Sequence, residues 1–173
     1  PAAFSLRGNA MHRALMFLAI LLLPVPANSQ SAATHMVEVL DMHLAMRAAL
    51  RAVEVCNEAG FQAGASVVDR FGVEQVTLRS NMGGAHVAET ARRKAWTAAS
   101  FNLPSSDLGS LAGPGGEASL AAIPGALPLA GGLPIVSATG MLLGAIGVAG
   151  GGGGENEAKC AKAGLDAIAD QLK

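Results

Sequence analysis

The chain has 173 residues, of which 51% are hydrophobic but only 3% aromatic, and it contains 22 glycines and no tyrosine. This length suffices for one domain with a core of its own, which must be built from alanine, valine, leucine and isoleucine because large rings are scarce. The formal net charge is −1 and no basic stripe is visible. We therefore do not expect nucleic acid as a main partner, since phosphate binding depends on clustered lysine and arginine.

Residues 1–29 have the pattern of an export signal. Met11-His12-Arg13 is a positively charged start, residues 14–23 form a short apolar run, and Ala27-Asn28-Ser29 is a small-x-small cleavage site. The apolar run is short for a bilayer span, so a retained N-terminal anchor is the less favoured alternative. The sequence thus predicts a periplasmic or secreted protein whose single domain comprises residues 30–173.

The first half of this domain predicts one helix followed by a strand pair. Apolar residues recur at steps of three and four over Val37–Ala59, and Gly60 is expected to end this helix. The opposite side of the helix is charged and carries His43. Two strands follow, Gly64–Asp69 and Val73–Ser80, joined by a turn with aspartate first and glycine last.

The middle of the chain predicts a second helix and then an irregular segment. The helix covers Ala85–Phe101, in which Glu89 and Arg93 are spaced to form an ion pair. Further on, Leu108–Ala112 is predicted as a short helix and Ala126–Leu129 as a short strand.

The C-terminal part predicts two more strands, Pro134–Val136 and Met141–Val148, a glycine loop at 150–154, and a final amphipathic helix. The apolar stripe of that helix consists of Ala158, Ala161, Leu165, Ile168 and Leu172. Gly144 and Gly147 predict a bulge or a close approach of another backbone. Hairpin-linked strands with helices grouped around them predict an α+β fold with an antiparallel sheet.

The glycine loop does not predict a nucleotide site. A phosphate-binding loop needs lysine and serine or threonine after its last glycine. Here Gly154 is followed by Glu155-Asn156-Glu157. Carboxylates at a helix N-terminus repel an incoming anion, so we expect no nucleotide cofactor.

Two cysteines, Cys56 and Cys160, fall on the first and last predicted helices and outside any Cys-x-x-Cys motif. Zinc-binding and thioredoxin-type functions therefore have no support. In an oxidising compartment the two cysteines could form a disulfide, while two separately buried thiols are an equally good interpretation. We expect both helices to lie on the same face of the sheet, so that the two cysteines approach each other.

Four short segments occur in a fixed order along the chain. They are Gly64-x-x-Val67-Val68-Asp69-x-x-Gly72, Arg93-Lys94-Ala95-x-Thr97-Ala98, Gly131-Gly132-x-Pro134-Ile135 and Gly144-Ala145-Ile146-Gly147-Val148. In this combination the chain, over residues 36–173, resembles the GlcG/HbpS family of haem-binding proteins. The resemblance implies a compact α+β domain with a profilin-like antiparallel sheet, homo-oligomers, and binding of haem or iron.

A haem iron needs an axial donor such as histidine, methionine, cysteine or tyrosine in an apolar slot. His86 lies in the first turn of the second predicted helix, one residue after Gly83-Gly84, and the resemblance places a Gly-x-His there as well. Arg93 and Thr97 share its helix face and Lys94 lies beside them, which predicts His86 as axial ligand and the two cations as propionate partners. Met82 is a second candidate donor. A surface histidine with only local hydrogen bonds is the alternative interpretation.

The sequence therefore predicts an exported haem- or iron-binding protein without catalytic activity. No serine stands in a G-x-S-x-G motif, and no paired carboxylates flank a histidine. The alternative is a sensory or accessory module that binds a small organic hydroxy acid and acts through a protein partner, such as a membrane sensor.

Overall fold

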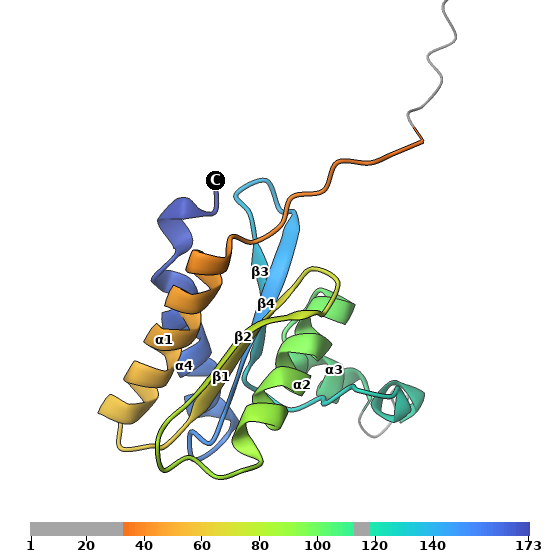
Figure 1. Ribbon diagram of the computed structural model, residues 1–173. Helices are drawn as coiled ribbons and strands as arrows, with labels where there is room; N and C mark the ends of the chain where they lie inside the picture. Colours follow the sequence, from red (N-terminus) through yellow and green to blue (C-terminus); the bar gives the residue numbers. More distant parts are fainter. Residues whose placement is uncertain (1–32, 113–117) are drawn as a thin grey trace, which may run out of the picture. The chain divides into compact units, whose positions relative to one another are not determined.

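The computed structural model of the protein describes residues 33–112 and 118–173 (Figure 1). The chain up to Met36 is a unit of its own, and the fold below is that of the second unit, Val37–Lys173. The predicted export signal lies outside the described residues. Among the residues that are described, no helix is long and apolar enough to cross a membrane.

A four-stranded antiparallel sheet forms the middle layer, in the order β2-β1-β4-β3. Its strands are β1 (Gly64–Asp69), β2 (Glu74–Arg79), β3 (Gly132–Val136) and β4 (Leu142–Ala149). The predicted α+β class with an antiparallel sheet is confirmed.

Helices cover both faces of the sheet. They are α1 (Met42–Glu58), α2 (Val87–Phe101), α3 (Ser105–Leu111) and α4 (Gly154–Asp166), with short 3₁₀ turns at Ala118–Ala122 and Ala169–Gln171. Helices α1 and α4 lie side by side on one face, and α2 covers the other (Figure 1). The two helices that carry the cysteines, α1 and α4, thus share a face of the sheet, as the sequence predicted.

Helix α1 begins at Met42 and not at Val37, so the predicted start was wrong by five residues. The Asp41 carboxylate accepts a hydrogen bond from the His43 backbone N–H at 2.8 Å and caps the helix there. Before the cap the chain is not helical, and the Leu40 carbonyl accepts a hydrogen bond from the Gln75 side chain of β2 at 2.9 Å.

Other predicted boundaries also needed correction. No strand forms at Ala126–Leu129, because hydrogen bonds from α2 side chains hold this segment as a loop. Helix α4 ends at Asp166, and the buried Ile168 leads into the final 3₁₀ turn. The predicted short helix begins earlier, at Ser105, after Pro104.

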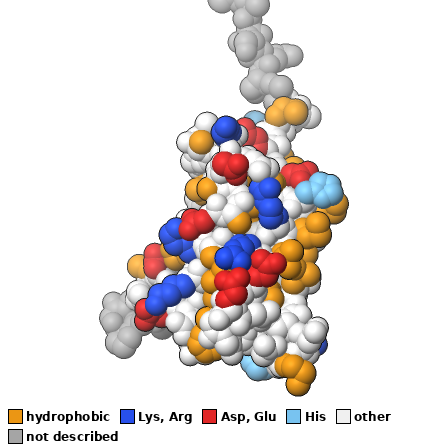
Figure 2. Space-filling view, turned by 90° about the vertical axis from the view of Figure 1, so that its left-hand side faces the viewer, with side chains coloured by type: hydrophobic (Ala, Val, Ile, Leu, Met, Phe, Trp, Pro, Cys, Tyr) orange, Lys and Arg blue, Asp and Glu red, His pale blue; other side chains and the backbone are white. Residues whose placement is uncertain are grey.

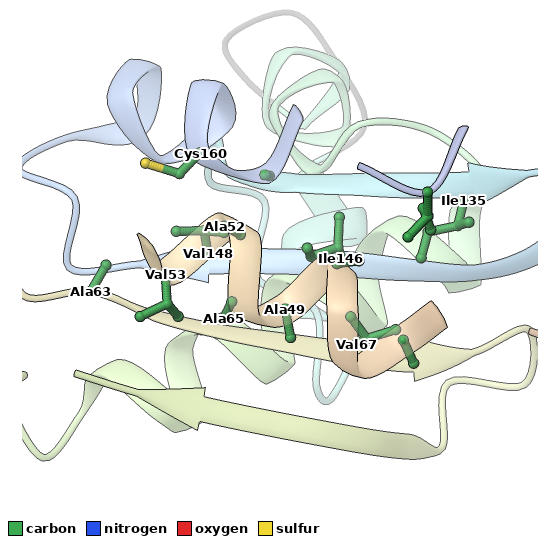
Figure 3. Packing of buried hydrophobic residues seen from close by; sticks show 14 of the residues in the cluster. Ala49, Ala52, Val53, Ala63, Ala65, Val67, Ile135, Ile146, Val148 and Cys160 are labelled. Carbon is green, nitrogen blue, oxygen red and sulfur yellow. The ribbon is translucent and has the colours of Figure 1, made fainter. Parts of the chain in front are cut away.

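The core between the α1–α4 layer and the sheet depends on small side chains (Figure 3). The inner face of α1 is almost entirely alanine: Ala45, Ala48, Ala49 and Ala52 are all fully buried. They pack over the larger Val67, Ile146 and Val148 of β1 and β4. Alanine lets the helix axis approach the sheet closely, so a tight core forms without aromatic residues.

Two glycines mark the closest contacts. A Cβ atom at Gly147 of β4 would collide with the Ala91 carbonyl and lie 2.5 Å from the Ala95 nitrogen of α2. A Cβ atom at Gly164 of α4 would lie 2.5 Å from the Ala48 carbonyl oxygen of α1. The close backbone approach predicted at Gly147 is therefore confirmed.

Cys56 and Cys160 form a disulfide between α1 and α4, with their Cα atoms 5.7 Å apart. Of the two interpretations that the sequence left open, the disulfide is the one observed. Both cysteines are buried, so the bond is part of the core that joins the two helices.

Replacing both cysteines with alanine should lower the free energy of unfolding by about 2–4 kcal/mol, because the bond closes a long loop in the unfolded chain. Urea denaturation of the Cys56→Ala/Cys160→Ala protein measures this, with the oxidised wild-type protein as reference. An unchanged midpoint and slope would show that the crosslink does not contribute to stability.

Candidate functional site

His86 lies just before the first residue of α2 and is exposed to solvent. Its backbone carbonyl accepts hydrogen bonds from the Thr90 N–H and hydroxyl at 3.0 and 2.8 Å. A side chain at Gly84 would lie 2.8 Å from the imidazole carbon Cε1. The space beside Gly84 is thus taken by the imidazole of His86 itself, and not left free for a flat ligand.

Arg93 and Thr97 form hydrogen bonds to the loop that precedes β3. The Arg93 guanidinium donates to the Ala126 carbonyl at 2.9 Å. The buried Thr97 hydroxyl donates to the Arg93 carbonyl and accepts from the Leu127 N–H, both at 2.8 Å. These side chains fix residues 125–127 against α2.

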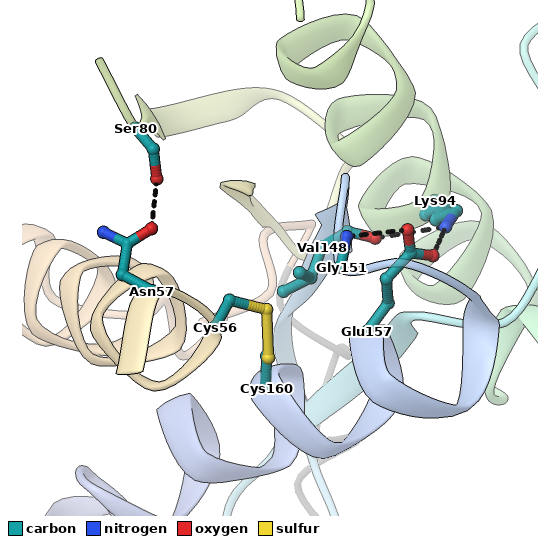
Figure 4. The surroundings of a disulfide bond; sticks show 8 residues. All are labelled: Cys56, Asn57, Ser80, Lys94, Val148, Gly151, Glu157 and Cys160. Atoms are coloured by element: carbon teal, nitrogen blue, oxygen red, sulfur yellow. Dashed lines mark hydrogen bonds and ion pairs between the residues drawn. A yellow bond between two sulfur atoms is a disulfide. The ribbon is translucent and has the colours of Figure 1, made fainter. Parts of the chain in front are cut away.

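Lys94 is directed into the protein and is only 3% exposed. Its ammonium group forms a short ion pair with Glu157 of α4 and donates to the Val148 carbonyl at 3.1 Å (Figure 4). Glu157 also accepts from the Gly151 N–H at 3.2 Å. This buried pair joins α2, the end of β4, the glycine loop and α4.

The predicted haem cluster on α2 is therefore not assembled. Met82 is 81% exposed, Lys94 and Thr97 are buried in hydrogen-bond networks, and Arg93 is occupied by the loop. Among the five predicted residues, His86 and Met82 are the ones that remain exposed.

The ion pair predicted between Glu89 and Arg93 is also wrong. Glu89 pairs with Arg92 through two hydrogen bonds of 2.7 Å. The Arg92 guanidinium, through its side-chain hydrogen bond, holds the pKa of the Glu89 carboxyl below its usual value. Arg93 points to the loop instead.

An open cavity lies elsewhere, on the outer side of α1. This open groove of about 560 Å³ is called the α1 groove below. It is lined by Asp41, His43, Leu44, Met46, Arg47, Leu50 and Gln171. Asp41 caps α1, the next five residues come from the first half of α1, and Gln171 comes from the final 3₁₀ turn, so the two ends of the domain build the groove together.

Large apolar side chains gather on the outer surface of the first half of α1, whereas the second half carries the exposed ion pairs of Arg51 with Glu54 and Glu58. Met42, Met46 and Leu50 follow one another at four-residue steps and are 59%, 48% and 47% exposed. Figure 2 looks onto the side of α1 and α4 and shows hydrophobic side chains gathered along one edge, with a histidine beside them. An imidazole, a thioether and a cation, that of Arg47, thus meet in an apolar groove.

The groove combines polar and apolar side chains. It has an imidazole from His43, an apolar wall from Leu44, Met46 and Leu50, a cation from Arg47, and a carboxylate and an amide from Asp41 and Gln171. The sequence analysis had placed His43 on the charged side of its helix. It gave no signal that Gln171 lines the same groove. Within the described residues, no three His, Cys, Asp or Glu side chains form a group that could hold a bare metal ion.

Comparison with known proteins finds similarity to HbpS-like proteins in both sequence and structure. The family model described as haem-degrading protein HbpS-like matches residues 40–166. The crystal structure of a double mutant of HbpS from Streptomyces reticuli is 35% identical, with a TM-score of 0.75, and the match covers 85% of this chain and 99% of that one. A second crystal structure of HbpS is 38% identical, with a TM-score of 0.74 and coverage of 79% and 94%.

A more distant neighbour is the crystal structure of a complex between PduOC and heme. It is 26% identical, with a TM-score of 0.68, and the match covers 75% of this chain and 95% of that one. The search of curated protein sequences found no match.

Replacing Lys94 with methionine tests whether this lysine is structural. The change leaves the Glu157 carboxylate buried without its cation, and the free energy of unfolding should fall by about 3–5 kcal/mol. The Lys94→Met/Glu157→Leu protein should regain most of this loss, as chemical denaturation will show. If Lys94→Met is as stable as wild type but binds haem less well, Lys94 is the ligand contact that the sequence predicted.

Proposed function

Because this chain belongs to the HbpS-like family of haem-degrading proteins, we propose that it binds haem in the α1 groove. The observation that carries the proposal is the position of His43 in this groove of about 560 Å³, which Met46 and Leu50 also line. His43 is the proposed axial ligand, and Arg47 the proposed partner of a propionate. His86, the axial ligand expected from the sequence, is the alternative, since it is also exposed.

The groove fits an amphipathic ring better than the end of α2 does. A porphyrin has an apolar body and two carboxylates at one edge, and the groove has apolar walls with a guanidinium among them. At His86 the neighbouring cations are occupied: Arg93 by the loop and Lys94 by Glu157. Burial of apolar ring surface supplies most of the affinity, so the wall matters as much as the axial nitrogen.

We propose that the role is binding and not catalysis. The sequence carries no nucleophile motif or flanking pair of carboxylates, which argues against hydrolysis. Haem degradation, the activity in the family's description, needs neither group and is tested separately with ascorbate below. A small organic acid is the second candidate ligand, and Arg47 in the groove favours it. In that case the protein acts through a partner such as a membrane sensor. Native mass spectrometry of the purified protein separates the two candidates, because a retained acid and a retained haem differ in mass.

We further propose that the protein is exported to the periplasm or secreted. The buried disulfide supports this, because such bonds persist in oxidising compartments. Self-association is proposed as well, since large apolar side chains such as Phe71 and Val73 stay exposed, at 66% and 61%. N-terminal sequencing of natively expressed protein and sedimentation test these two proposals.

Haem titration of two histidine variants decides where the ligand lies. His43→Ala should weaken haem binding by about tenfold or more and shift the Soret band, because axial ligation sets the electronic state of the iron. Arg47→Ala should weaken binding less and leave the band in place, since a propionate contact is partly solvated.

His86→Ala is the matched control and should bind as wild type does. If His86→Ala loses haem and His43→Ala keeps it, the site lies at the start of α2. A Soret band that disappears during incubation with ascorbate would contradict a purely binding role.

A further inference from the structure

The methionines of this protein are in unusual places. Of the seven in the chain, five lie in the described residues, and every one of these five is exposed. The exposed fractions are 99% for Met36, 59% for Met42, 48% for Met46, 81% for Met82 and 41% for Met141. Methionine is ordinarily a buried residue that fills gaps in cores. Here alanine, valine, isoleucine and leucine fill the described core, which leaves the thioethers at the surface.

Two of these thioethers stand beside a histidine. Met42, His43 and Met46 occupy the first two turns of α1, at positions i, i+1 and i+4. Residues four apart on a helix stack on one face with Cβ atoms about 5–6 Å apart. The inner face of α1 is the alanine face, so all three side chains are exposed on its outer side.

Met46 is a neighbour on the helix surface of both Met42 and His43, whereas Met42 and His43 are consecutive and do not face each other. Met46 and His43 line the same groove, and Met42 lies one turn before Met46. A methionine side chain has three rotatable bonds and a polarizable sulfur, so it can turn towards a neighbouring donor without moving the backbone. None of the three is needed for packing against the sheet.

We propose that Met42, His43 and Met46 form a binding site for Cu(I). Thioether sulfur is a soft ligand that selects Cu(I), and imidazole is a good copper ligand as well. Zinc would prefer further thiolate, imidazole or carboxylate ligands. The two cysteines, which would compete for copper as thiolates, are joined in the buried disulfide.

This site goes beyond the proposed haem function and shares His43 with it. The same nitrogen of His43 cannot bind a haem iron and a copper ion at once. Haem and copper should therefore exclude each other in the groove. The two proposals still depend on different atoms. Copper needs the sulfur of the methionines, whereas haem needs only their apolar surface and volume.

Substitution by leucine separates these requirements, because leucine keeps the apolar surface and the helix propensity but has no sulfur. Cu(I) is titrated anaerobically against bicinchoninate with ascorbate as reductant, which leaves the disulfide intact. Wild type should take up one equivalent. Met42→Leu/Met46→Leu should bind Cu(I) at least about tenfold more weakly. Losing a residue that only hydrogen-bonds a metal ligand already costs about tenfold in affinity, and losing two ligands should cost no less.

The control is Met82→Leu/Met141→Leu, which removes two exposed thioethers far from His43 in sequence and should leave copper binding unchanged. Urea denaturation of Met42→Leu/Met46→Leu should give the wild-type midpoint and slope, which shows that it is folded. His43→Ala should lose copper. X-ray absorption at the copper edge should show two sulfur neighbours and one nitrogen neighbour.

The proposal is overturned if wild type takes up no Cu(I), or if the Met42→Leu/Met46→Leu protein binds it as tightly as wild type. An equal loss of Cu(I) affinity in the Met42→Leu/Met46→Leu and Met82→Leu/Met141→Leu proteins would also overturn it. Such a result would indicate that Cu(I) binds to exposed methionines anywhere on the surface. Failure of haem binding in every protein, with copper binding retained in wild type, would reject the haem proposal and leave the copper site standing.

Discussion

The close contact of α1 with the sheet and with α4 is the constraint on which the rest of the structure depends. Gly164 lets α4 come up to the Ala48 carbonyl of α1, and four buried alanines bring α1 down onto β1 and β4. The Cys56–Cys160 bond then joins the two helices. Because alanines occupy most of the inner face of α1, the large apolar side chains Met42, Met46 and Leu50 lie on its outer face.

This division of α1 gives the protein its candidate site. A helix that buried its methionines and leucines would present a polar surface outside. Here the buried stripe is small and the exposed stripe is large, so Met46 and Leu50 line the α1 groove next to His43. The disulfide lies near the other end of α1, at Cys56, and fixes the helix that supports this groove.

The sequence predicted the elements because their signals are local. The turn between β1 and β2, the small residues of β4 and the apolar periodicity of α1 and α4 need only nearby residues to be recognised. The position of α1 was misjudged at its start because apolar residues continue before Asp41, while the capping hydrogen bond from the His43 N–H fixes the true start. A capping aspartate inside an apolar pattern was the signal that could have been used.

The candidate site could not be predicted in the same way, because its contacts are not local. Lys94 looked free beside His86, yet its partner Glu157 lies 63 residues later in the chain. Arg93 and Thr97 likewise bond to a loop that carries no periodic pattern. The α1 groove needs Gln171 from the last turn of the chain, and no motif links that residue to His43. The family resemblance suggested haem as the ligand, and the arrangement of side chains is the basis on which we propose His43 over His86.

The measurement that tests the central claim most directly is the NMR spectrum of ¹³C-labelled methionine methyl groups during titration with ferric haem. The paramagnetic iron broadens the signals of nearby methyl groups, and the described methionines mark different parts of the surface. If haem binds in the α1 groove, the signals of Met42 and Met46 broaden first while those of Met82 and Met141 stay sharp. Broadening of Met82, four residues before His86, with sharp signals for Met42 and Met46, would contradict the account.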